Sequence, residues 1–96
     1  MATTTIQYNY NYVLETLLRI RSAKFGFNRS NEKNGCAINV FGYTKELPVL
    51  IKFIFNIDNE LKHIIYDNKN IEFYEGGFTI SNFVIKIVDD FCMNES

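Results

Sequence analysis

The strongest apolar run of the chain is PVLIKFIFNI, at residues 48–57. With the two-residue period of a strand, one face of this run is wholly apolar: Val49, Ile51, Phe53, Phe55 and Ile57. The other face is half apolar, because Leu50 and Ile54 alternate with polar residues. A strand with this pattern belongs at the centre of a sheet rather than at its edge. The run therefore predicts a sheet built around residues 48–57.

A helix is predicted before this strand, over residues 11–24. Its apolar side chains recur at three- and four-residue spacing: Val13, Leu14, Leu17, Leu18 and Phe25. Asn9 or Asn11 can cap its start, and Gly26 is expected to follow its end. Residues 1–9 are expected to form an extended arm or edge strand, although a Thr-x-x-Gln capping box also allows a helix there.

Turn-forming and apolar segments alternate after the helix. Residues 27–35 are predicted as a polar loop. Strands are predicted at residues 36–43, 48–57, 61–66 and 71–75, with turns at 44–47, 58–59 and 67–70. Residues 78–92 fit either a helix or a strand, because β-forming residues there also share one helical face. We favour a helix at 82–93.

These elements predict an α+β fold in the order α-β-β-β-β-α. The expected architecture is an antiparallel sheet of about four strands, with one helix before it, one after it and a single layer of helices on one sheet face. The 96 residues fit a single small domain, and the 47% of hydrophobic residues can supply its core. A net charge of -1 argues against a disordered chain.

The N-terminal residues lack the basic and apolar regions of a signal peptide, and no apolar run is long enough for a membrane span. We expect a cytoplasmic protein with no membrane contact. Asn, Ile, Lys, Tyr and Phe are abundant, which is typical of an AT-rich coding sequence from a low-GC bacterium, its mobile elements or a virus.

Residues that could carry chemistry are few. Cys36 and Cys92 are best explained as buried reduced thiols, with one long-range disulfide as the alternative. His63 is predicted to face the apolar side of its strand or its rim, in phase with Leu61 and Ile65. These three side chains are too few and too scattered for a zinc site or a Cys-His nucleophile pair. We therefore expect no catalytic, metal or cofactor-binding site and no enzyme.

Three groups of residues are candidates for binding a partner. The basic group spans the first helix and the following loop: Arg19, Arg21, Lys24, Arg29 and Lys33. The acidic group lies on predicted turns: Asp58, Glu60 and Asp67. The aromatic group lies near the N-terminus: Tyr8, Tyr10 and Tyr12. Tyrosine is a favoured interface anchor. Solvated surface, or packing beside the first helix, is the simpler explanation of each group.

The order of helix, three strands and helix resembles the double-stranded RNA-binding domain. That family carries a basic motif at the start of its last helix, whereas residues 79–84 of this chain contain no Lys or Arg. The basic group can still contact phosphates, which makes a nucleic-acid-binding module the alternative function.

The function expected first is non-enzymatic binding of another protein. A small chain without a catalytic set fits the profile of a viral or mobile-element inhibitor of a host defence system, such as an anti-CRISPR protein. Tyr8, Tyr10 and Tyr12 on an exposed edge can also pair two copies into a homodimer or other homo-oligomer.

Overall fold

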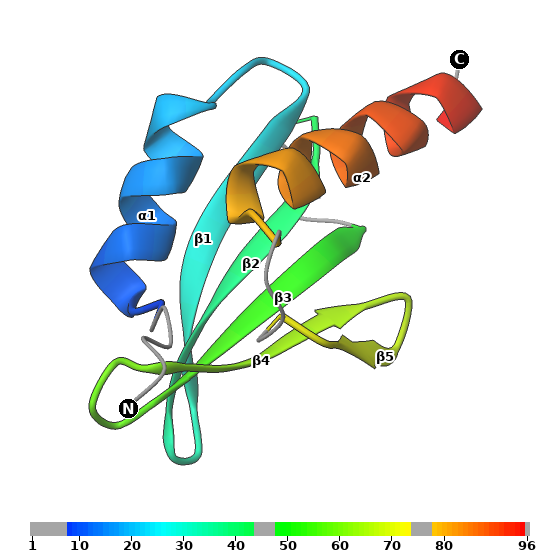
Figure 1. Ribbon diagram of the computed structural model, residues 1–96. Coiled ribbons are helices and arrows are strands. Elements are labelled where there is room, and N and C mark those ends of the chain that lie inside the picture. The colour runs from blue at the N-terminus through cyan, green and yellow to red at the C-terminus, as the bar shows by residue number, and fades with distance from the viewer. Residues whose placement is uncertain (1–7, 44–47, 74–77, 96) are drawn as a thin grey trace.

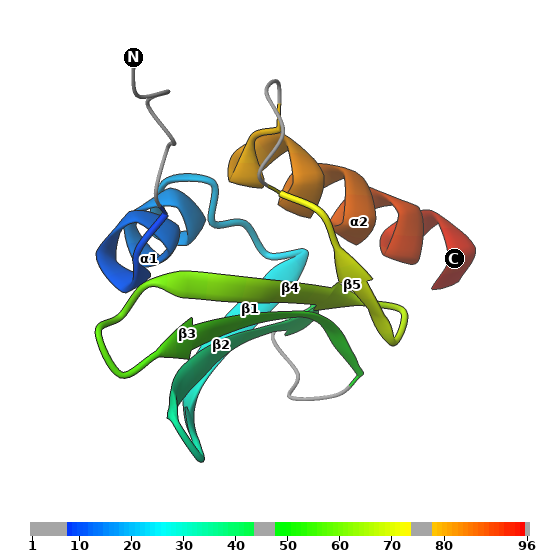
Figure 2. The ribbon, with the colours of Figure 1, turned by 60° about the horizontal axis from the view of Figure 1, so that its bottom comes forward.

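The computed structural model describes residues 8–43, 48–73 and 78–95. The elements, in chain order, are α1 (Tyr10–Arg19), β1 (Phe25–Glu32), β2 (Gly35–Gly42), β3 (Val49–Asn56), β4 (Leu61–Tyr66), β5 (Lys69–Ile71) and α2 (Ile80–Glu95). The five strands form one antiparallel sheet in the order β1-β2-β3-β4-β5. Both helices lie on the same side of this sheet (Figures 1 and 2). The predicted α+β architecture is confirmed, with five strands in place of about four.

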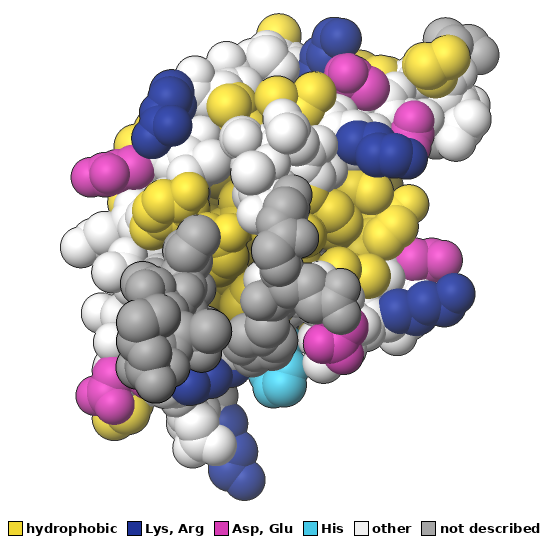
Figure 3. All heavy atoms as spheres, in the orientation of Figure 1, with side chains coloured by type: hydrophobic (Ala, Val, Ile, Leu, Met, Phe, Trp, Pro, Cys, Tyr) yellow, Lys and Arg dark blue, Asp and Glu magenta, His cyan; other side chains and the backbone are white. Residues whose placement is uncertain are grey.

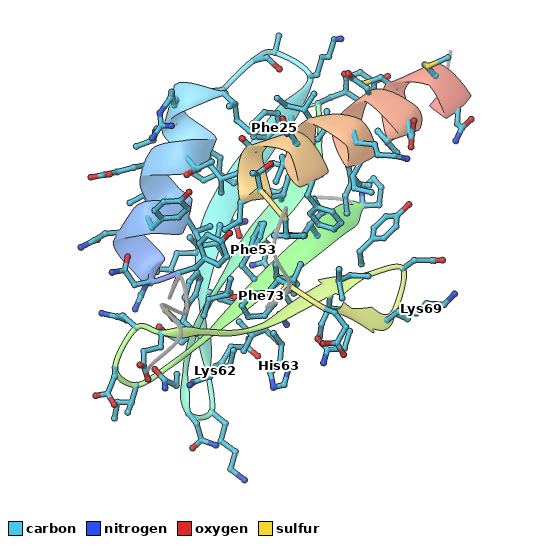
Figure 4. The ribbon with its side chains drawn as sticks, viewed as in Figure 1. Phe25, Phe53, Lys62, His63, Lys69 and Phe73 are labelled. Carbon is cyan, nitrogen blue, oxygen red and sulfur yellow. The ribbon has the colours of Figure 1, made fainter. Side chains whose placement is uncertain are left out.

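The central position of β3 is confirmed. Ile51, Phe53 and Phe55 are buried on its inner face, and Phe53 lies between Ile38 of β2 and Ile64 of β4. Phe25, Phe53 and Phe73 belong to the same core cluster, and Figure 4 shows Phe53 between the other two. The apolar face does not extend to both ends as expected. Val49 is 45% exposed and lies beyond a register shift of the β2–β3 pairing at Val40/Phe41. Ile57 is 84% exposed, because β3 ends at Asn56 and Ile57 lies in a turn.

The predicted loop at residues 27–35 is wrong, because most of it belongs to the strand β1. Helix α1 begins after Asn9, whose side chain accepts a hydrogen bond from the Tyr12 N–H at 2.8 Å, as expected of a cap. It ends at Arg19, so Gly26 is a strand residue and not a helix terminator. An edge strand needs an apolar side chain only where the core reaches it, which is why β1 is so polar.

The β3–β4 pairing contains a register shift between Ile54 and Phe55. Such a bulge places two residues of one strand opposite one residue of the other. Lys62 and His63 are therefore both exposed, while Leu61 and Ile64 are buried. The prediction that His63 faces the apolar side is wrong, since the bulge changes the strand period at this point.

The turns and the last helix follow the predicted order. The turn at residues 58–59 and the strand at 61–66 are confirmed. Asp67 and Asn68 have φ values of 56° and 61°, which suits a type I′ hairpin turn. This turn leads into β5 two residues earlier than predicted, and residues 44–47 and 74–75 lie outside the described residues. The predicted last helix is confirmed and extends over Ile80–Glu95. Cys36 is a buried free thiol and Cys92 a half-buried one.

Candidate functional site

The two edges of the sheet differ in length. The outer edge at β5 is only three residues long, which is a common way to prevent unwanted strand pairing. The other edge, β1, is eight residues long and contains no proline. A long edge strand presents a row of backbone groups to any extended chain that reaches it. We call this side of the sheet the β1 edge.

The hydrogen bonds of the β1–β2 ladder show which backbone groups point outward. The Tyr43 N–H donates to the Lys24 carbonyl oxygen at 2.6 Å, just before β1 begins. In an antiparallel pair, hydrogen-bonded and non-bonded positions alternate. The even-numbered residues of β1 therefore bond to β2. The outward N–H and C=O groups belong to Phe25, Phe27, Arg29 and Asn31. Among the described residues, no further strand pairs with this edge.

A groove borders the β1 edge beneath α1. It encloses about 380 Å³ and is lined by Leu18, Arg21, Phe25, Gly26, Phe27 and Phe41. In Figure 1 α1 lies to the outside of β1, and Figure 2 shows α1 on the same side of the sheet as α2. Leu18 is 50% exposed, because no strand lies below it on this side of β1. We call this space the α1–β1 groove.

Arg29 does not line this groove, but its side chain lies on the same face of β1 as Phe27 and is held there by two contacts. Its guanidinium carbon lies 5.8 Å from the centre of the Tyr10 ring, within the range of a cation–π contact. Its Nη1 donates a hydrogen bond to Asn31 Oδ1 at 3.3 Å. The Tyr10 ring is itself held edge-on against Phe55, with the ring centres 5.4 Å apart. These contacts hold a positive charge beside the outward backbone groups.

The three tyrosines of the aromatic group have different environments. Tyr8 is buried, and its hydroxyl donates to the Phe78 carbonyl oxygen at 3.0 Å. Burial, followed by the nearby Tyr12 hydroxyl, raises the pKa of Tyr8 above its ordinary value. Tyr10 is half-buried. Tyr12, at 46% exposed, is the member of the group that solvent reaches most.

The basic group does not form one compact patch. Lys24 pairs with Asp89 at 3.3 Å. Arg19 and Arg21 lie near the end of α1, whereas Lys33 is in the β1–β2 turn. At about 3.3 Å per residue, the extended chain separates Lys24 from Lys33 by roughly 30 Å. Figure 3 shows the Lys and Arg side chains as separate groups around the rim of one face. The extended β1 therefore spreads these charges along its length.

The acidic group is also divided. Asp58 and Glu60 lie at the β3–β4 turn, and Asp67 lies at the other end of β4. Glu60 accepts a hydrogen bond from Asn56 Nδ2 at 2.9 Å and lies 3.6 Å from the Lys62 ammonium group. The hydrogen bond, and then the lysine charge, hold the pKa of Glu60 below its ordinary value. Glu60 is thus part of a local turn network.

A second groove lies on the sheet face opposite the helices, at the bulge. It encloses about 320 Å³ and is lined by Glu32, Lys33, Asn34, Ile54, Phe55, Asn56, Lys62 and His63. Figure 4 shows Lys62 and His63 close together at the bottom of the view, below β4. The charges around it are mixed, and Glu32 already pairs with Lys52 at 3.5 Å. No group of three or more metal-ligating side chains occurs among the described residues.

The residues of the β1 edge were not among the sequence candidates, apart from the basic side chains. The only signal was the spacing of Phe25 and Phe27, which share a strand face. No helix in the described part of the chain is long and apolar enough to cross a membrane. Comparison of the chain with protein-family models, with curated proteins and with solved structures finds no match.

Proposed function

We propose that this chain is a non-enzymatic protein that binds another protein by accepting an extended segment of it at the β1 edge. The length of the open edge supports the proposal most directly, since the opposite edge is kept to three residues. Strand addition derives its affinity from main-chain hydrogen bonds and its specificity from alternate side chains. The outward backbone groups of β1 can form the main-chain hydrogen bonds. The α1–β1 groove can accept the alternate side chains of the bound segment.

An inhibitor of a host defence system, carried by a phage or mobile element, is one kind of protein that this proposal describes. Its target would then present an extended segment or an edge strand of its own. The proposal includes no catalytic step, and the described residues that line the α1–β1 groove contain no acid–base pair or activated nucleophile.

Co-purification with a variant that blocks the edge tests the proposal. Tagged wild-type protein and Asn31→Pro are used to capture proteins from a bacterial lysate, with and without nuclease treatment. Proline at residue 31 removes an outward N–H and leaves the β1–β2 ladder intact. We expect a protein that the wild type retains and the variant loses. Equal retention by both proteins, or retention that nuclease abolishes, would contradict strand addition.

A further inference from the structure

We propose that the segment bound at the β1 edge is an acidic, apolar-centred strand that runs antiparallel to β1. In this strand an apolar side chain is flanked, two residues away on either side, by carboxylates. The inference rests on the proposed function and adds the chemistry of the partner. It follows from the outward N–H and C=O groups of β1, the lining of the groove and the position of two arginines.

The backbone of β1 determines which partner side chains enter the groove. Phe25, Phe27 and Arg29 point their N–H and C=O groups outward, and their side chains lie on the face that bears the helices. Partner residues directly opposite them exchange both main-chain hydrogen bonds and point their own side chains to the same face. Every second residue of the partner therefore lies beneath α1.

The middle of the groove is apolar. Leu18 of α1 and Phe27 of β1 line it on the face that bears the helices, whereas Phe41, which pairs with Gly26, lines it from the other face. The exposed half of Leu18 would be covered by a side chain placed opposite Phe27. Burial of apolar surface contributes about 25 cal/mol for each Å² removed from water, so a branched aliphatic residue is favoured at this position.

An arginine stands on either side of the position opposite Phe27. Arg21 lines the groove together with Phe25, and Arg29 lies outside the groove lining, two residues beyond Phe27 on the same face of β1. The described lining contains no acidic side chain. Opposite charges in directly opposed positions stabilise strand pairing. Tyr10 and Asn31 already restrain the Arg29 side chain, which lowers the entropy lost when a carboxylate binds it.

The position of α1 explains why a second copy of this chain is a poor occupant of the β1 edge. A symmetric antiparallel pair of β1 strands would bring the α1 helices of both copies to the same edge, because α1 lies outside β1 (Figure 1). A single extended segment has no such helix. A partner strand without its own covering helix on that side therefore fits the groove.

Binding of defined peptides tests the inference by fluorescence anisotropy at moderate salt. The probe is a short capped peptide with valine at the centre, glutamate two residues away on either side, and serine between them. Its counterpart has lysine in place of both glutamates. We expect the glutamate peptide to bind at least about tenfold more tightly than the lysine peptide, from two charge pairs and two avoided repulsions.

N-methylation separates strand addition from simple charge attraction. Methyl groups on the valine and glutamate nitrogens block the bonds to β1, whereas methyl groups on the serine nitrogens point away. The first peptide should bind about tenfold or more weakly, and the second should bind like the parent. In the protein, Arg29→Gln should weaken binding by about two- to fivefold. Lys69→Gln, on the opposite edge, should leave it unchanged.

Equal binding of the glutamate and lysine peptides, or equal effects of the two methylation patterns, would overturn the inference. Displacement of the peptide by an oligo-dT strand at a lower concentration would also overturn it, because the groove would then favour phosphates. The glutamate peptide could fail to bind while the wild type still captures a protein that Asn31→Pro does not capture. That result would support the proposed function and contradict the acidic, apolar-centred partner strand.

Discussion

The direction of the β1 backbone predicts opposite outcomes for proline at two adjacent residues. By the alternation of the ladder, the Ser30 N–H points to Ala37 of β2 and the Asn31 N–H points outward. Ser30→Pro removes the N–H that donates to the Ala37 carbonyl oxygen, and this oxygen loses its hydrogen-bond partner in β1. Because Ala37 is fully buried, the loss is about 1–3 kcal/mol of unfolding free energy.

Asn31→Pro should change the unfolding free energy by no more than about 0.5 kcal/mol, since it removes an exposed N–H and an exposed contact to Arg29. Urea unfolding, followed by circular dichroism, measures both variants at equal protein concentration. Thermal scans give a second reading, because in a domain of this size 1 kcal/mol corresponds to about 4–8 °C. If Asn31→Pro lost as much stability as Ser30→Pro, residue 31 would be bonded within the protein and the edge would not be open.

Three further outcomes are expected. Gly35→Ala should cost about 1–3 kcal/mol in urea unfolding, because a Cβ there meets the Phe55 carbonyl oxygen of β3 and the strand must shift. The raised pKa of Tyr8 means that its burial stabilises the fold below its ordinary pKa, near 10. That stability is lost as pH rises through the raised pKa of Tyr8, so Tyr8→Phe should flatten the fall of stability measured as the pH is raised above about 10. Arg21→Glu with Lys24→Glu should leave duplex RNA and DNA affinity unchanged in salt-dependent anisotropy, since the basic group is spread along β1.

The first two outcomes have a control variant, and the third has a result that would contradict it. Gly42→Ala should cost less than Gly35→Ala, because its Cβ meets the half-buried Phe91 ring, which can rotate, rather than backbone. Tyr12→Phe is the control for the pH series. If the stability of Tyr12→Phe changed with pH as that of Tyr8→Phe does, the loss of stability at high pH could not be assigned to Tyr8. Salt-sensitive nucleic-acid binding that the double charge reversal abolishes would restore the nucleic-acid-binding alternative.

Local patterns were sufficient for the elements whose apolar faces are wide. The inner face of β3 repeats over several pleats, so period alone identifies it. The shared helical face of α2 favoured a helix, although its β-forming residues left a strand as the alternative. The cap at Asn9 and the turn at residues 58–59 were also readable, because they depend on side chains close in the sequence.

The interactions that join distant parts of the chain were not readable in this way. Tyr8 looked like an exposed anchor, yet Phe73 and Phe78 enclose it from far along the chain. The bulge that turns His63 outward depends on the pairing of β4 with β3. The amino-acid sequence of β4 alone does not indicate this bulge. Pairing register is a property of two strands together.

The amount and period of apolar side chains were enough to predict the α+β class, the central strand and the first helix, and they favoured a helix at the end of the chain. The strand β1, its place at the edge of the sheet and the outward direction of its odd-numbered residues beside Leu18 and Arg29 became visible only in the folded chain. A polar edge strand buries too little surface to leave a periodic signal. Its open backbone groups exist only once β2 has paired with the other side.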